Sequence, residues 1–242
     1  MAHPPGELAV TGVVVWGANN IYSVRDEAGT IHEHVRLKGK VLPGAEGEHN
    51  PLAPGDQVTM DYSGESPRIV ARNDRENTVV RWNRTRRRMQ AIAANTDLLA
   101  IVTSRGTPEY RPAFVDRVLV MAELEQLPVI IVENKADLPR LEDAEDHLAT
   151  LRALGYETAA TVATAPDDPD VAALHDRLSG LSTVFFGQSG VGKSSLINRL
   201  VPGLELATGD VSRRYQRGRH TTTLARQVLI SGAGGTTVYV DT

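Results

Sequence analysis

The chain has 242 residues and no cysteine, and its formal net charge is −4 at pH 7. This length allows one or two domains with a sizeable core, and the lack of cysteine excludes a disulfide framework and a thiolate zinc site within the chain. The first residues lack the basic and apolar regions of a secretory signal, and no apolar run is long enough to cross a membrane. We therefore expect a soluble, cytoplasmic and monomeric protein without a membrane partner.

The first part of the chain, residues 1–78, has short strand-like runs separated by turns rich in glycine and proline. This pattern is typical of a small β-barrel. Composition alone leaves an OB-fold and an SH3-like barrel as alternatives. The expected strands are residues 8–16, 21–26, 32–42, 57–62 and 69–71.

Two stretches are strongly basic although the whole chain is acidic. Residues 81–88 (RWNRTRRR) and 213–220 (RRYQRGRH) both combine arginines with an aromatic side chain. Arginine suits nucleic-acid phosphates and aromatic rings stack on unpaired bases, so both stretches favour an RNA partner. A solvated surface is the alternative for either stretch alone. We expect residues 79–88 to form a basic linker between two domains.

From Asp97 onward, apolar runs of strand length alternate with helical patterns. This alternation is typical of an α/β domain with a doubly wound, mostly parallel sheet. Gly155 follows one expected helix, where a glycine can take the left-handed cap conformation. The expected strands are residues 97–103, 129–133, 158–163, 183–186, 227–230 and 237–240, and the expected helices are residues 112–126, 141–154, 169–178 and 194–200.

A phosphate-binding loop is predicted at residues 187–194 (GQSGVGKS), which match the pattern G-x-x-x-x-G-K-[ST]. An apolar strand precedes the loop and a helix follows it, so the main-chain N–H groups can surround a triphosphate. Lys193 is expected to reach the β- and γ-phosphates, and the Ser194 hydroxyl is expected to ligate Mg²⁺. The full set of expected loop contacts is Gly187, Gln188, Ser189, Gly190, Val191, Gly192, Lys193, Ser194 and Ser195.

A second motif, N-K-x-D, follows the apolar run 129–132 and comprises Asn134, Lys135 and Asp137. It lies at the carboxyl end of an expected parallel strand, where open α/β sheets bind ligands. The carboxylate of Asp137 can accept hydrogen bonds from guanine N1–H and the 2-amino group, and adenine has no such pair of donors. The tetrapeptide alone is a weak signal, but with a phosphate loop in the same chain it predicts binding of GTP and GDP.

The order of the two motifs is unusual, because the base motif precedes the phosphate loop. The same site would then be built from a circularly permuted chain. In this order, and with residues 37–40 (LKGK), 93–97 (AANTD) and 218–223 (GRHTTT), the sequence resembles the RsgA family of GTPases that depend on the small ribosomal subunit. The resemblance covers nearly the whole chain.

The resemblance implies an N-terminal OB-fold that contacts ribosomal RNA, followed by a circularly permuted P-loop GTPase domain at residues 89–242. It implies that Thr222 in the first switch and Asp241 join Ser194 around Mg²⁺. His220 is a candidate for positioning the attacking water, with Lys193 and Thr222 as further catalytic residues; a surface histidine is the alternative. The guanine-backing segment is expected near residues 162–165, although its sequence departs from the family motif.

The resemblance also implies a role. GTP would be hydrolysed to GDP and phosphate by in-line attack of water, with stimulation by the small ribosomal subunit, during late maturation of that subunit. Family members continue beyond the D-x-P-G motif into a zinc-binding C-terminal domain, so we expect the GTPase domain to be incomplete and zinc to belong only to that further domain. Two other functions stay open at this point: a P-loop ATPase or kinase, and an RNA-binding module without catalysis.

Overall fold

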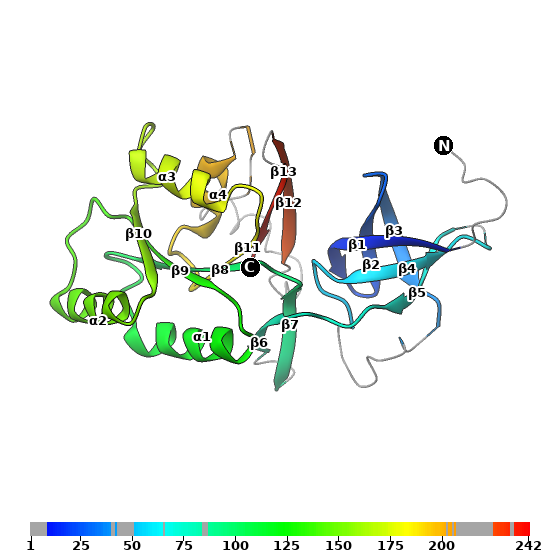
Figure 1. Cartoon of the computed structure of the whole chain (residues 1–242), viewed down its shortest axis with the longest axis horizontal. Coiled ribbons are helices and arrows are strands. Elements are labelled where there is room, and N and C mark those ends of the chain that lie inside the picture. The colour runs from blue at the N-terminus through cyan, green and yellow to red at the C-terminus, as the bar shows by residue number, and fades with distance from the viewer. Residues whose placement is uncertain are drawn as a thin grey trace, which may run out of the picture. The chain divides into compact units, whose positions relative to one another are not determined.

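The computed structural model describes residues 9–39, 42, 51–64, 66–83, 87–201, 203–204, 206, 225–232 and 235–242. The chain divides into two compact units (Figure 1). The first comprises Met1–Asn95 with Leu224–Gln227, and the second comprises Thr96–Thr223 with Val228–Thr242. None of the helices in the described part is long and apolar enough to cross a membrane.

The first unit contains a closed five-stranded barrel, built from β1 (Ala9–Ala18), β2 (Ile21–Asp26), β3 (Ile31–Leu37), β4 (Gln57–Asp61) and β5 (Arg68–Arg72). The strands pair in the order β1-β2-β3-β5-β4, and β1 also pairs with β4, which closes the barrel. Strands β3 and β5 run parallel, whereas the other pairs within the barrel are antiparallel. This arrangement confirms the OB-fold expectation.

The barrel core follows from the alternation of side chains along each strand. Val14, Val24, Met60 and Ile69 are each fully buried, and Tyr22 is 2% exposed. Asp56 is also buried, where its carboxylate forms an ion pair with Arg75 at 2.7 Å. The loop before β4 is thus attached to the segment that follows β5.

A two-stranded hairpin follows the barrel, formed by β6 (Thr78–Asn83) and β7 (Arg88–Ala94). The expected linker, residues 79–88, therefore includes most of β6 and the first residue of β7. Val79 in β6 is buried. Trp82 lies opposite Met89 in the hairpin, and the two side chains are 56% and 55% exposed. The hairpin belongs to the first compact unit, whose first segment runs to Asn95.

The second unit is built on a sheet whose strands lie in the order β10-β9-β8-β11-β13-β12. The pairs from β10 to β13 are all parallel, which confirms the mostly parallel sheet. The strands are β8 (Leu98–Ser104), β9 (Val129–Asn134), β10 (Glu157–Thr161), β11 (Ser182–Gly187), β12 (Arg226–Gly232) and β13 (Gly235–Asp241).

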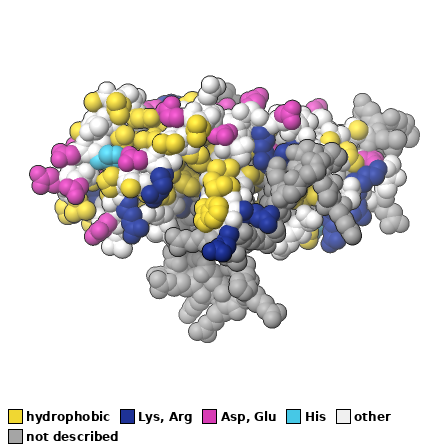
Figure 2. Space-filling model, turned by 90° about the horizontal axis from the view of Figure 1, so that it is seen from below, with side chains coloured by type: hydrophobic (Ala, Val, Ile, Leu, Met, Phe, Trp, Pro, Cys, Tyr) yellow, Lys and Arg dark blue, Asp and Glu magenta, His cyan; other side chains and the backbone are white. Residues whose placement is uncertain are grey.

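In the described part of the chain, four helices cover this sheet: α1 (Pro112–Leu124), α2 (Glu142–Ala153), α3 (Pro169–Leu178) and α4 (Lys193–Leu200). Figure 1 shows α1 and α2 on one side of the sheet and α3 and α4 on the other, so the sheet is doubly wound. Helix α3 begins at a proline after Asp168, whose side chain accepts from Asp170 N. Acidic residues occupy the first turn of α2, and Figure 2 shows acidic side chains gathered over this helix.

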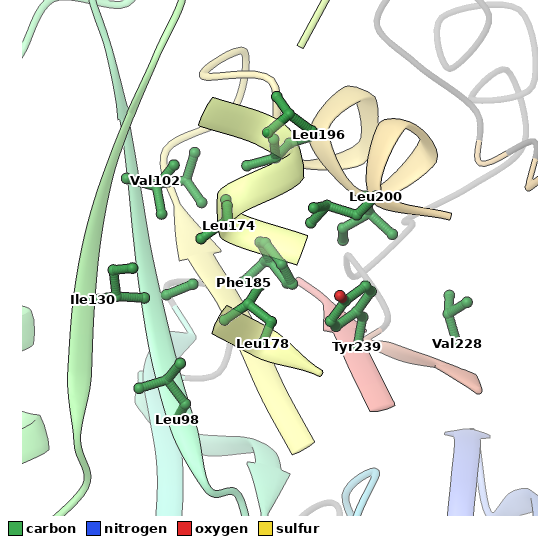
Figure 3. Close-up of a cluster of buried hydrophobic side chains, with 14 of the residues drawn as sticks. Leu98, Val102, Ile130, Leu174, Leu178, Phe185, Leu196, Leu200, Val228 and Tyr239 are labelled. Carbon is green, nitrogen blue, oxygen red and sulfur yellow. The ribbon is translucent and has the colours of Figure 1, made fainter. Parts of the chain in front are cut away.

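Helices cover both faces of the sheet, which explains why β8 and β9 are continuous apolar runs in sequence. Leu98 and Val102 of β8 belong to one buried cluster with Leu174 of α3 and Leu196 of α4 (Figure 3). Phe185 of β11 and Tyr239 of β13 meet edge to face, with ring centroids 5.2 Å apart. This packing holds the carboxyl ends of β9, β11 and β13 at one edge of the sheet.

Candidate functional site

The phosphate loop, residues 187–194, connects the end of β11 to the first turn of α4. Gly190 and Gly192 take left-handed conformations, with φ of +88° and +98°. Gly192 is the N-cap of α4 and supplies no side chain to cap the helix. No side chain caps the start of α4, so an anionic ligand can bind at the N–H groups of its first turn, as a phosphate site requires.

Two glycines allow the phosphate loop to lie against neighbouring strands. A Cβ at Gly187 would be 2.3 Å from Val102 O of β8, and a Cβ at Gly192 would be 2.3 Å from Asn134 Nδ2. A side chain at Gly187 would overlap the main chain of β8, and a side chain at Gly192 would displace Asn134. The spacing of glycines in the motif thus reflects close approach to other parts of the sheet as well as to phosphate.

Lys193 and Ser194 follow directly in the loop. Lys193 Nζ donates to Gly187 O at 3.0 Å and to Gln188 O at 3.3 Å, so the ammonium lies over the loop where phosphates are expected. Ser194 Oγ donates to Asp241 Oδ2 at 2.7 Å. Asp241 reaches this place because it ends β13, opposite Phe185 in the register with β11.

The pair Ser194 and Asp241 fits Mg²⁺. A hydroxyl and a carboxylate are hard oxygen ligands, and Mg²⁺ in phosphate sites takes one or two protein ligands and completes its shell with water and phosphate. A cluster of three or more acidic, histidine or cysteine side chains is absent from the described residues, and Mg²⁺ in such a site does not need one. These two residues would therefore hold the ion.

The base motif lies next to the phosphate loop. Asn134 is buried at the end of β9, and its Nδ2 donates to Val191 O at 3.0 Å. Lys135 Nζ donates to Gly190 O at 2.8 Å and also to Thr107 O. Asp137 remains exposed. In this arrangement Asn134 and Lys135 support the phosphate loop, while Asp137 is the member of the motif that is free to face a base.

The segment expected behind the base also meets the motif. Ala163 N donates to Asn134 Oδ1 at 3.2 Å, just after the end of β10. A turn follows, in which Ala165 N donates to Val162 O. The segment therefore lies beside Asn134, and its role behind the base stays a prediction.

Three charged residues at this sheet edge were not predicted from the sequence. Glu133 precedes Asn134, the last residue of β9, and its side chain is 3% exposed between Arg105 and Arg140. Burial alone would raise the pKa of Glu133, but hydrogen bonds from Arg140 and Arg105 outweigh it and hold the pKa below its usual value. The available signal was a single acid at the end of the apolar run 129–132.

Two predicted catalytic residues, Thr222 and His220, lie outside the described residues, as do the basic stretch 213–220 and the neighbouring threonines. Of the other predicted residues, the structure brings the phosphate loop, Asn134, Lys135 and Asp241 into contact through the bonds above. Ser195 follows in the first turn of α4, and its side chain is partly buried. Nucleotide and metal contacts of all these residues stay predictions.

Comparison with known proteins agrees with this geometry. The family model of the RsgA GTPase matches residues 72–242. The protein named small ribosomal subunit biogenesis GTPase RsgA from Borreliella afzelii is 37% identical over 231 residues, which cover 95% of this chain and 73% of that protein. The protein of the same name from Bacteroides fragilis is 33% identical over 228 residues, covering 92% of this chain and 73% of that protein.

Two solved structures share the fold. YjeQ from Thermotoga maritima superposes with a TM-score of 0.65 at 29% identity, covering 97% of this chain and 74% of that one. YloQ, described as a circularly permuted GTPase, gives a TM-score of 0.60 at 23% identity, covering 100% of this chain and 74% of that one. The permuted order of motifs, the strand order and the family match agree, and the chain belongs to the RsgA GTPase family.

Proposed function

We propose that this protein binds GTP, hydrolyses it to GDP and phosphate, and acts in late maturation of the small ribosomal subunit, which stimulates the hydrolysis. The names of its relatives support the role in biogenesis of this subunit. The observation that carries the nucleotide assignment is the contact between two motifs in reversed order. Asn134 and Val191 are 57 positions apart in sequence, yet their side chain and carbonyl are hydrogen bonded.

Different residues of the site would bind the phosphates, the base and Mg²⁺. The open N–H groups of the phosphate loop would hold the phosphates, and Lys193 would exchange its carbonyl partners for phosphate oxygens. Asp137 would accept from guanine N1–H and the 2-amino group, which selects guanine over adenine. Mg²⁺, held by Ser194 and Asp241, would neutralise charge on the phosphates when bound.

Hydrolysis would proceed in line. A water oxygen would bond to the γ-phosphorus while the bond from the γ-phosphorus to the β,γ-bridging oxygen breaks, and GDP would leave with that oxygen. Charge that develops on the phosphoryl oxygens would be stabilised by Lys193 and the loop N–H groups. We propose Thr222 as a switch residue that closes over the γ-phosphate and His220 as the residue that orients the water. This assignment rests on the family resemblance of residues 218–223.

Ribosomal RNA is the proposed partner of the first unit. Trp82 and Met89 form an exposed apolar pair on the hairpin, and Arg87 and Arg88 are exposed next to it. An exposed tryptophan beside arginines suits stacking on an unpaired base together with phosphate contact. Replacing Arg87 and Arg88 with alanine should flatten the salt dependence of subunit binding by about one slope unit per lost phosphate contact. If the salt dependence of the variant has the same slope as that of the wild type, the two arginines do not contact RNA phosphates and the hairpin is a solvated surface.

The experiment that tests the proposal is GTP turnover with and without purified small ribosomal subunits. We expect slow turnover of the protein alone, faster turnover with small subunits, and no effect of large subunits, which serve as the matched control. Excess ATP should not compete. Equal competition by ATP would refute the guanine assignment, and identical rates with small and large subunits would refute the ribosomal role.

A further inference from the structure

The buried acid at the end of β9 requires an explanation, because placing a carboxylate out of water costs free energy unless it is paired and hydrogen bonded. Successive residues of a strand face opposite sides of a sheet. Asn134 points to the phosphate loop, whereas Glu133 points to Arg105, whose Nη2 lies 2.8 Å from Glu133 Oε2, and to Arg140.

Arg105 connects this acid to the base loop, residues 134–138. Its Nε donates to Glu133 Oε2 at 2.9 Å, and its Nη1 donates to Ala136 O at 2.6 Å with a longer contact to Leu138 O at 3.4 Å. These two carbonyl groups flank Asp137. The planar guanidinium has five donors in a fixed fork and can therefore hold an acid and a main-chain loop at the same time.

Arg140 makes a different set of contacts. Its Nε donates to both oxygens of Glu133, at 2.9 and 3.0 Å, and its Nη1 contacts Glu145 of α2. Within the described part of the chain, the hydrogen bonds of Arg140 join two acids and do not reach the carbonyls beside Asp137. The two arginines thus share the same acid, but only Arg105 contacts the loop that carries Asp137.

We propose that Arg105 is a positioning residue for guanine specificity: held by Glu133, it fixes the main chain on both sides of Asp137 so that the carboxylate meets the 2-amino group of the base. This inference rests on the proposed function. Ala136 N donates to Thr161 O and Leu138 N donates to Lys135 O, both at 3.0 Å, so Arg105 adds to main-chain hydrogen bonds that already shape this loop, while the Asp137 side chain is exposed. A binding group discriminates well when its supporting residues fix it before the ligand arrives, because less order has to be created on binding.

The test compares GDP with inosine diphosphate, whose base lacks the 2-amino group. Titration calorimetry on the wild-type chain should give a preference for GDP of about tenfold or more, the effect of one hydrogen bond to a charged group. In Arg105→Gln we expect GDP affinity to fall almost to that of inosine diphosphate, while affinity for inosine diphosphate changes little. The matched control is Arg140→Gln, which also removes an arginine from Glu133 and should keep the wild-type preference.

The outcomes separate the two hypotheses. If the wild type does not prefer GDP over inosine diphosphate and ADP, the proposed guanine site itself fails. If the wild type has the preference and Arg105→Gln keeps it, or Arg140→Gln loses it equally, Arg105 has only a structural role. Should Arg105→Gln fail to fold, Arg105→Lys retains a charge beside Glu133 without the fork. A reduced GDP preference in that variant supports the inference, and an unchanged preference overturns it.

Discussion

The two loops of the candidate site acquire their shape by different means. The phosphate loop depends on backbone conformation, since Gly190 and Gly192 have positive φ and a Cβ at Gly192 would displace the Asn134 side chain. The base loop depends on charged side chains, since Arg105 donates to the carbonyls around Asp137 and is itself paired with Glu133. The glycines that shape the first loop belong to its sequence motif, whereas Arg105 and Glu133 lie outside the N-K-x-D motif of the second loop.

The largest expected effect tests the phosphate loop. Lys193→Ala should weaken GTP binding by about 100-fold or more, because each lost hydrogen bond to a charged group costs about 1.5–3 kcal/mol. Titration calorimetry measures the affinity, and thermal unfolding should change little because Lys193 is not part of the core. Lys38→Ala is the control, because it removes a lysine that pairs with Asp61 in the barrel. Unchanged affinity in Lys193→Ala would contradict the phosphate assignment.

The base loop gives the next largest effect. Asp137→Asn should weaken GDP binding by about 1.5–3 kcal/mol, because a charged acceptor is lost. The same variant should gain affinity for xanthosine diphosphate, since an amide can donate to the 2-oxo group. Competition between the two nucleotides measures this change of preference. If both affinities equal those of the wild type, Asp137 does not contact the base.

A glycine substitution sharpens the role of backbone conformation. Gly192→Ala should lower GTP affinity roughly tenfold, because a left-handed conformation costs an alanine about 1–2 kcal/mol and the new Cβ meets Asn134. Gly155 is the matched control, since it has φ of +95° with no atom within 4 Å of an added Cβ. Gly155→Ala should show similar strain in thermal unfolding with intact affinity. Equal loss of affinity in both variants would point to general instability.

The smallest effect concerns pH and the buried acid of the base loop. The pKa of Glu133 in the folded protein lies below its ordinary value of 4.5. Above that pH, the interaction of ionised Glu133 with Arg105 and Arg140 therefore stabilises the fold. This contribution is lost as the pH falls through the folded-state pKa. Glu133→Gln should therefore be less stable than the wild type by a constant amount between about pH 7 and 5, with a smaller difference at lower pH.

Denaturant unfolding of both proteins from pH 7 to 3 measures this difference. Other carboxylates with lowered pKa values, such as Asp26 and Asp61, are present in both proteins and cancel in the comparison. A stability difference that stays the same down to pH 3 would mean that ionised Glu133 does not stabilise the fold.

The sequence alone determined the α/β class, the mostly parallel sheet, and the motif order that indicates a permuted chain. These features are local, because glycine spacing, apolar runs and a helix after a strand are all patterns of residues close together in the sequence. Element ends were less certain, as in the helix expected at residues 112–126, which ends at Leu124. The capped end at Gly155 was predicted because a left-handed glycine is also a local signal.

Only the tertiary structure decided which distant residues meet. The parallel pairing of β3 with β5 selected the OB-fold over an SH3-like barrel, and the pairing of β6 with β7 replaced the expected linker by a hairpin. The approach of Arg105 to Glu133 also follows from strand order. The approach of Ser194 to Asp241, in contrast, was expected from the family resemblance. The physical reason is that the sequence around a charged side chain does not identify its ion-pair partner. Strand pairing decides which arginine or carboxylate lies next to that side chain.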